Sequence, residues 1–384
     1  MAMTTTESNN KLVKYTQEIS REFVRENLFS PYMSRDLNAI IRLRHDLKDG
    51  GEQMNIPLVT KLTGRGKGSG TLVGSEEKID NYGMRLWVDW ARHAVATKKS
   101  DQQKDSADVF GEAKPLLVDW GKERQRDDII GALMALPLAA EPDGLGSDDG
   151  QTVNGILYEA ATAAQRNTWN AANSDRVLYG NAVANYNATH ATALANVDTT
   201  NDRFVKGSVE LIKRIAMNAN PRIRPYKTAN GYEYFVAFAG TNTFRDLKSS
   251  LEEINKDARS REGGGMDKNP LFQDGDLLHD GVIIRQVPEI SAFVTDVWTT
   301  LATAGNGSTR VEPVFLCGQQ AACLGWGQMP KPTFRKEDDY GFITGTGTEM
   351  CYGAAKMFKK HPMDGSNLVQ WGLVSGFFSA PLDA

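Results

Sequence analysis

The stretch IPLVTKLTGRGKGSG, residues 56–70, decides the fold. Its first part, Ile56 to Leu62, is rich in β-branched and apolar side chains and predicts a strand. The alternating glycines of residues 64–70 predict a turn that many backbone conformations can satisfy. Residues 84–95 then predict an extended return. Together these segments predict a long β-hairpin that protrudes from the body of the protein.

The apolar side chains of this hairpin predict a contact with another molecule. A two-stranded excursion has no second layer against which it can bury them, so a neighbouring copy of the chain is the natural partner. The candidate contact residues are Leu58, Leu62, Leu72, Leu86 and Trp87.

Two basic residues at the hairpin tip, Arg65 and Lys67, suggest an electrostatic element of the same contact. They could pair with acids such as Glu123 and Asp127 on a helix of a neighbour. Exposed pairs of this kind contribute only about 0–1 kcal/mol each, so they would set register more than strength. The alternative reading is that these charges only keep an unpaired tip soluble.

Before the hairpin, residues 11–29 form an amphipathic pattern that predicts an N-terminal arm. Its apolar face carries Tyr15, Ile19 and Phe23, which we expect to contact a neighbouring subunit. A second helical pattern covers residues 36–47 and ends at the glycines of 50 and 51.

After the hairpin, the pattern of residues 106–136 is helical and predicts one long helix. Residues 204–218 predict a further helix, and Tyr232–Phe238 is the best strand of the chain, aromatic and β-branched enough for the centre of a sheet. The remaining C-terminal part alternates strand-like pieces. The chain is therefore expected to have an α+β fold.

Composition excludes several classes of protein. With 44 Lys and Arg against 48 Asp and Glu, the net charge of −4 argues against a protein that grips nucleic acid through its phosphates. The longest apolar run, residues 131–140, is about half of a membrane span and contains Pro137, so no membrane segment is expected. The first ten residues are polar and predict no secretory signal. Three cysteines with no CxxC pair predict no disulfide framework.

No catalytic, metal or cofactor site can be assembled from the sequence. The glycines of 64–70 do not match a phosphate-binding loop, because Lys67 is followed by Gly68 where such loops have Ser or Thr. The five histidines stand far apart, without a ligand partner at metal-site spacing. An enzyme is therefore not expected, and neither is a cofactor.

The ordered features resemble the major capsid proteins of tailed bacteriophages, in particular the coat-protein family typified by the N4-like podoviruses, within the Hong Kong 97-like fold. The resemblance runs over nearly the whole chain. Besides the arm and the hairpin it is carried by short motifs whose order and spacing together are specific: Val73-Gly-Ser-Glu-Glu77, Asp175-Arg-Val-Leu-Tyr-Gly180, Asn269-Pro-Leu-Phe272, Gly281-Val-Ile-Ile284, Leu316-Cys-Gly-Gln-Gln-Ala-Ala-Cys-Leu324, Asp339-Tyr-Gly341 and Gln370-Trp-Gly-Leu-Val374.

The resemblance implies a division of the chain into named parts. These are an N-terminal arm (1–35), a helical connection (36–49), an extended hairpin loop (50–97), a peripheral domain (98–199) with a spine helix at about 103–138, an axial α/β domain (200–335), and C-terminal strands (336–384) that return to the peripheral domain.

The resemblance also implies a function. Such subunits form hexamers and pentamers that close into an icosahedral shell around double-stranded DNA, which they enclose without sequence-specific binding. The implied partners are a scaffolding protein, a portal and a decoration protein, and the implied location is the virion, after assembly in the host bacterial cytoplasm. Two alternatives remain open: an encapsulin-like compartment that holds cargo, and a mixed α/β enzyme.

Overall fold

The structure is a computed structural model. It describes residues 28–47, 50–51, 53–59, 62, 64–77, 81–104, 111–137, 151–228, 231–251, 272–273, 276–335, 340, 342–360 and 368–383. The expected arm residues Tyr15, Ile19 and Phe23 lie outside these ranges.

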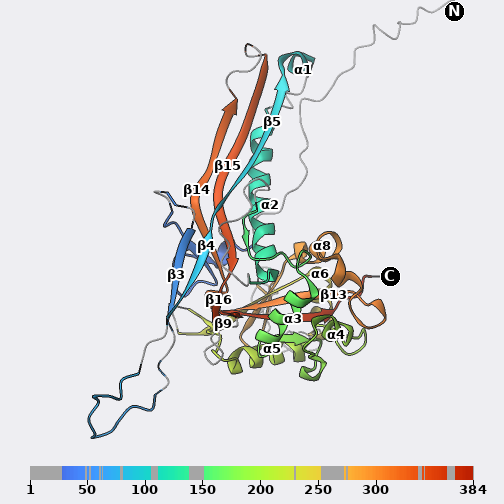
Figure 1. Cartoon of the computed structure of the whole chain (residues 1–384). Coiled ribbons are helices and arrows are strands. Elements are labelled where there is room, and N and C mark those ends of the chain that lie inside the picture. The colour runs from blue at the N-terminus through green and yellow to red at the C-terminus, as the bar shows by residue number, and fades with distance from the viewer. Residues whose placement is uncertain are drawn as a thin grey trace, which may run out of the picture.

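One half of the molecule is an elongated six-stranded sheet backed by a long helix (Figure 1). Its long strands are antiparallel, with β15 in the middle paired on one side with β14 and on the other with β5. Helix α2 (Ala113–Met134) packs along β15. The strand order is β1 (Met33–Ser34), β2 (Ile41–Arg44), β14 (Ala322–Arg335), β15 (Ile343–Lys356) and β5 (Asp89–Lys98), and β6 (Val153–Asn154) pairs with the end of β15.

The other half is built on an eight-stranded mixed sheet. Its central strands β9 and β13 are almost entirely buried, as the aromatic and β-branched run at 232–238 predicts. The order is β10 (Phe272–Gln273), β11 (Asp276–His279), β12 (Val282–Gln286), β9 (Glu233–Ala239), β13 (Val311–Cys317), β18 (Leu373–Ser379) and β7 (Val177–Tyr179), with β8 (Tyr226–Lys227) paired to β9.

Helices cover both faces of this second sheet, because alternate strand residues point to opposite sides. On one face α5 (Lys206–Asn218) and α6 (Thr241–Ser250) pack in a core with Phe235, Val314 and Phe378. On the other face lies a larger core with Phe238, Phe315 and Phe377. It includes residues of α3 (Ala163–Ala172), α4 (His190–Ala195) and α8 (Pro288–Asp296).

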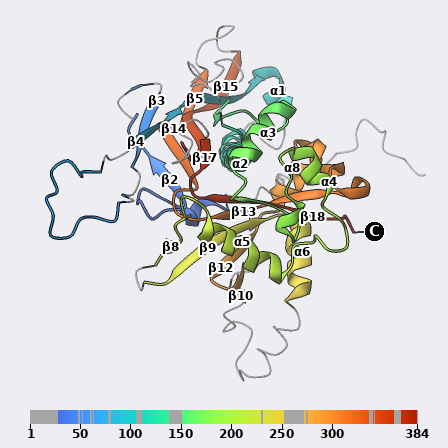
Figure 2. The same cartoon turned by 60° about the horizontal axis from the view of Figure 1, so that its bottom comes forward.

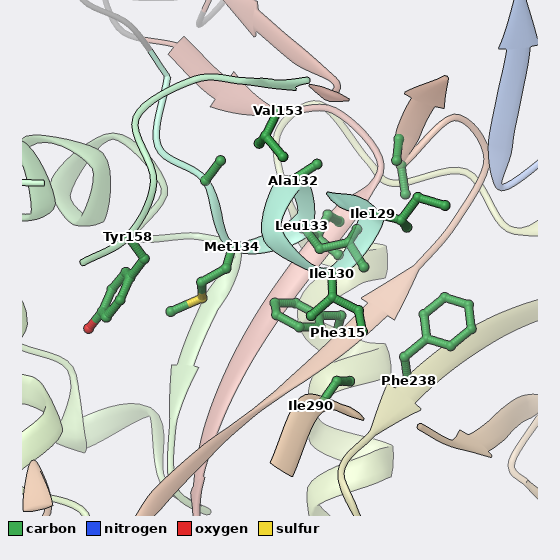
Figure 3. Packing of buried hydrophobic residues seen from close by; sticks show 14 of the residues in the cluster. Ile129, Ile130, Ala132, Leu133, Met134, Val153, Tyr158, Phe238, Ile290 and Phe315 are labelled. Atoms are coloured by element: carbon green, nitrogen blue, oxygen red, sulfur yellow. The ribbon is translucent and has the colours of Figure 1, made fainter. Parts of the chain in front are cut away.

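The C-terminal end of α2 joins the two halves (Figure 3). Ile129, Ile130 and Leu133 are buried in the larger core together with Phe238 and Phe315 of the eight-stranded sheet. The buried carboxylate of Asp128 accepts hydrogen bonds from the hydroxyls of Thr152 and Tyr352, which fastens α2 to the six-stranded sheet. One helix therefore links the packing of both halves.

Smaller elements complete the described chain. Two antiparallel ribbons are formed by β3 (Gln53–Val59) with β4 (Asn81–Trp87) and by β16 (Phe358–Lys360) with β17 (Leu368–Gln370). Helix α1 (Lys99–Lys104) follows β5, and short 3-10 helices cover Ser30–Tyr32, Val183–Asn185, Thr299–Thr303 and Asn306–Ser308.

Several expectations from the sequence differ from this arrangement. The prediction of a helical connection at 36–49 is wrong, because Ile41–Arg44 is strand β2. In this strand Ile41 and Leu43 alternate with arginines, and the strand pairs in parallel with β14. The long helix is confirmed as α2, but in the described chain it begins at Ala113. Residues 89–98 pair with β15 instead of with the first hairpin strand.

The sheets also divide the chain differently from the expected ranges. β14 lies within the range assigned to the axial domain but pairs with β15 in the six-stranded sheet. β18 lies within the range expected to return to the peripheral domain but pairs with β13 in the eight-stranded sheet. Each long C-terminal strand therefore completes a sheet begun earlier in the sequence.

Candidate functional site

The hairpin is a ribbon with a packed foot and an extended tip (Figure 1). The foot is the β3–β4 pair, in register from Gln53 opposite Trp87 to Val59 opposite Asn81. The tip is the described loop of residues 62 and 64–77, which leads away from the body in both views of the molecule (Figure 2).

The foot buries its apolar face against its own subunit. Met54, Ile56, Met84 and Leu86 form a core with residues of the six-stranded sheet and with Met357, which follows β15. Gly325 of β14 allows this close packing, since a Cβ there would lie 2.7 Å from atoms of both Met54 and Leu86. The foot is therefore an internal part of the fold.

Trp87 is held at the same place by main-chain hydrogen bonds. Its N–H donates to Asn154 Oδ1 at 2.8 Å, and its carbonyl accepts from Asn154 Nδ2 at 3.0 Å. A side chain at Gly353 would collide with that carbonyl oxygen. Leu86 and Trp87 were expected to contact a neighbour. They are instead only 0% and 7% exposed within the subunit, because β14 and β15 lie against Leu86 and Asn154 of β6 holds Trp87.

The tip leaves large apolar side chains in solvent. Leu62, Leu72 and Val73 are 60%, 65% and 81% exposed. Hydrogen bonds join parts of the loop to one another: Glu77 Oε2 accepts from the N–H of Gly64 at 2.7 Å, and Glu76 Oε2 accepts from the N–H of Gly74 at 2.8 Å. Of the expected contact residues, Leu62 and Leu72 thus remain available. Leu58 lies in β3.

The charged residues expected to meet across the contact have different surroundings. Arg65 and Lys67 are exposed at the tip. Glu123 and Asp127 on α2 lie 3.8 Å and 2.9 Å from Arg126 of the same helix. Burial raises the pKa of Asp127, and Arg126 opposes that shift. These two acids are already engaged within the subunit, so pairing with Arg65 or Lys67 would have to compete with Arg126.

A second apolar surface, which the sequence reading missed, lies on the distal part of the six-stranded sheet. Val95, Thr346 and Phe334 stand side by side on β5, β15 and β14. Thr346 is buried, whereas Val95 and Phe334 are 37% and 55% exposed. The sequence signal for this surface was the alternation of side chains within residues 89–98. These residues form a strand of the six-stranded sheet and not a strand of the hairpin.

The most enclosed polar cluster surrounds His190. The Tyr179 hydroxyl donates to Asn170 Oδ1 at 2.8 Å, so it accepts from His190 Nδ1, 2.6 Å away. His190 Nε2 then accepts from the Tyr158 hydroxyl, 2.9 Å away. Burial lowers the pKa of His190 to about 3, so the ring is neutral at pH 7. Every member is satisfied and the ring is only 2% exposed, which fits a structural node and not a catalytic site.

Nothing in the described residues gathers the groups that metal binding or thiol chemistry needs. No cluster of three His, Cys, Asp or Glu side chains is found among them. Cys317, Cys323 and Cys351 are free and buried, and burial raises the pKa of the Cys323 thiol to about 12. Among the described helices, none is long and apolar enough to span a membrane.

The comparisons with known proteins agree with one another. A sequence model of the family described as phage capsid protein matches residues 3–372. The capsid of cyanophage Pam1 is similar at 35% identity and a TM-score of 0.85, over 100% of both chains. The capsid of Ralstonia phage GP4 has 18% identity and a TM-score of 0.70, over 98% of this chain and 97% of that one.

More distant structures share the fold alone. The head of Helicobacter pylori bacteriophage KHP40 has 11% identity and a TM-score of 0.62, over 97% of this chain and 96% of the other. No curated protein sequence matches the chain.

Proposed function

The chain belongs to the phage capsid protein family and is a phage major capsid protein, and from that premise we propose how its subunits hold together: the tip of each hairpin lies across an adjacent subunit. In this arrangement the subunits form hexamers and pentamers of an icosahedral shell that encloses double-stranded DNA. The eight-stranded sheet forms the axial domain, and the six-stranded sheet with α2 forms the peripheral domain, as in the Hong Kong 97-like fold.

One observation carries the proposal. Leu62, Leu72 and Val73 are exposed on a loop that extends from a foot whose inward side chains, such as Ile56 and Leu86, are completely buried. A soluble subunit that left these side chains in water would gain nothing from the extension, whereas burial on a neighbour removes apolar area at about 25 cal/mol per Å². Each subunit would give one tip and receive one, and such head-to-tail contacts close into rings when the rotation permits.

The charge balance supports a container in preference to a DNA clamp. With a net charge of −4, the wall has no excess of cations with which to hold DNA phosphates everywhere. We propose further that assembly takes place in the host cytoplasm on a scaffolding protein, around a portal, with a decoration protein added to the outside, and that the subunit itself is not an enzyme.

Deletion of the tip tests the proposal. A chain lacking Thr63 to Thr71 keeps the foot, so the subunit is expected to fold, while closed shells are expected to be lost. The full-length chain and the variant Val183→Ser, which alters an exposed valine in the eight-stranded half, are the controls. Sedimentation and negative-stain microscopy measure the outcome. Normal shells from the deleted chain would show that the tip is not the clasp, and DNA-free shells that retain a host enzyme would favour a cargo compartment.

A further inference from the structure

The six-stranded sheet has one long edge that the described chain leaves open. β5 pairs with β15 along all ten of its residues, and its other side has no strand partner among the described residues. The N–H of Lys99 donates to Phe342 O at 2.9 Å, which fixes the alternation: odd-numbered residues of β5 bond toward β15. The N–H and C=O groups of Arg92, Ala94, Ala96 and Lys98 therefore point outward.

Trp90 is the first residue of β5 whose main-chain N–H and C=O groups point away from β15, so the open edge begins there. The N–H of Trp90 is taken by the side chain of Asp89 at 2.7 Å, as expected for a group that does not reach β15. Beyond it, the residues of β5 up to Lys98 are exposed except Ala91, which is buried, and Thr97, which is half-buried. His93 stacks on Trp120 of α2 with ring centroids 5.0 Å apart, so α2 covers a face of this strand and not its edge.

The opposite edge of the same sheet is protected. Strand β2 pairs with β14 only at Ala322–Gly325, and the rest of that edge carries Pro330 and Pro332. By the same alternation the Pro332 nitrogen faces outward, where it offers no N–H to a further strand. Within the described residues, the sheet thus excludes strand addition at the β14 margin and leaves it open at the β5 margin; Figure 1 shows where these two strands lie.

We propose that β5 pairs edge to edge with β5 of a second copy of this chain, antiparallel and centred on Ala94, as a two-fold contact of the shell. The inference deepens the proposed self-association and rests on it. A centre at Ala94 sets Arg92 opposite the partner's Ala96 and Trp90 opposite the partner's Lys98. Asp89 then meets the partner's Lys99. No like charges face each other, and the Ala94 pair and the two Arg92–Ala96 pairs can each exchange two hydrogen bonds.

The hairpin tip of a neighbour fits this edge less well. Residues 64–70 alternate glycine with other residues and form no strand. Glycine weakens strands, and Arg65 and Lys67 would be brought toward Arg92 and Lys98. The exposed side chains of the tip are apolar, which suits a side-chain surface better than a row of main-chain polar groups. A second β5 presents the same unused groups in the complementary order.

Symmetric disulfides test the pairing in assembled shells of the full chain. In an antiparallel pair centred on residue 94 the two Ala94 Cα atoms are about 5.5 Å apart, within the range of a disulfide. Ala94→Cys is therefore expected to give a covalent dimer on mild oxidation. Two Ala96 residues would be separated by about 13 Å along the strands, so Ala96→Cys should not cross-link. The double variant Arg92→Cys, Ala96→Cys should cross-link again.

Wild type is the background control, since its three cysteines are buried. Shells of Ala94→Cys without covalent dimer, or dimer from Ala96→Cys alone, would overturn the pairing. Because shell formation is scored separately by microscopy, that result would leave the capsid function untouched. A second variant, Ala94→Pro, removes an N–H that the described chain does not use and should weaken shells, whereas Ala94→Val should not. Normal Ala94→Pro shells would also overturn the inference.

Discussion

The foot and the tip of the same hairpin differ in how far their apolar side chains are buried. At the foot, Ile56 and Leu86 are completely buried on the subunit's own sheet. At the tip, Leu72 and Val73 have comparable side chains and lie in solvent. The difference shows that the apolar content of a ribbon does not by itself reveal an interface. What matters is whether the subunit supplies a second layer, as Gly325 and its neighbours do for the foot.

Truncation at the foot is expected to have the largest effect on the subunit and so would break the comparison most directly. Leu86→Ala removes a fully buried side chain that packs over Gly325. Such changes lower the free energy of unfolding by about 2–5 kcal/mol, because they leave a cavity as well as lost contacts. Denaturant unfolding of dissociated subunits measures it. A loss below about 0.5 kcal/mol would show that the foot does not pack against its own subunit when that subunit is dissociated.

A buried lysine near the foot allows a second test of packing there, through the pH dependence of the unfolding free energy. Lys356 at the end of β15 is fully buried, its Nζ has no hydrogen-bond partner among the described residues, and burial lowers its pKa from 10.5 to about 7. The unfolded chain then binds more protons between these values, so stability is highest above pH 10.5 and falls as pH drops toward 7. Lys356→Met should raise the free energy of unfolding at pH 7 by on the order of a few kcal/mol.

The control for this variant is Lys206→Met, which changes an exposed lysine of α5. It should leave unfolding unchanged, and only Lys356→Met should flatten the rise in stability between pH 7 and pH 10. A destabilised Lys356→Met subunit would mean that the amine is solvated or paired in the folded protein, and the charge argument would fail.

The histidine node should give a smaller effect on the acid side. The pKa of His190 is lowered to about 3 by burial, against 6.5 in the unfolded chain. Its contribution to stability is therefore present above pH 6.5 and is lost as pH falls toward 3, at up to about 1.4 kcal/mol per pH unit. Between pH 6.5 and pH 5 the wild-type unfolding free energy should fall, and His190→Gln should show a shallower slope. An equal slope in His190→Gln, with His279→Gln as control, would exclude this histidine as the cause.

Much of the fold follows from local pattern, but pairing between distant segments does not. Residues 232–238 were predicted as a strand from their aromatic and β-branched side chains, and residues 204–218 were predicted as a helix; both are confirmed. Residues 36–49 were misread, since Ile41 and Leu43 become a strand only through β14, far along the chain. The predicted return at 84–95 belongs to two different sheets for the same reason: Trp87 ends one ribbon, and two residues later β5 joins another sheet.

The candidate surface shows the same limit. The sequence indicated the exposed Leu62 and Leu72, whose glycine-rich surroundings rule out local packing. The sequence could not distinguish these two exposed residues from the buried Leu86 and Trp87. The place of Trp87 depends on Asn154 and Gly353, which lie far along the chain. The distal Val95 and Phe334 were missed, because only the register of β14, β15 and β5 places them in one row.

Substitutions at the tip are expected to have the smallest effect on the stability of the subunit. They test directly whether the tip, unlike the foot, is buried only in the shell. Leu72→Ser and Val73→Ser change side chains that are 65% and 81% exposed, so the unfolding free energy of the dissociated subunit should shift by less than about 0.5 kcal/mol. If the tip lies on a neighbour, the same variants lose buried apolar area at every repeated contact, and shells should dissociate at lower denaturant or fail to close. Light scattering of shells beside unfolding of subunits measures both. Leu37→Ser, also 63% exposed but outside the hairpin, is the matched control. Equal shell stability for the tip variants and the control would mean that the tip remains in solvent in the shell as it does in the single subunit.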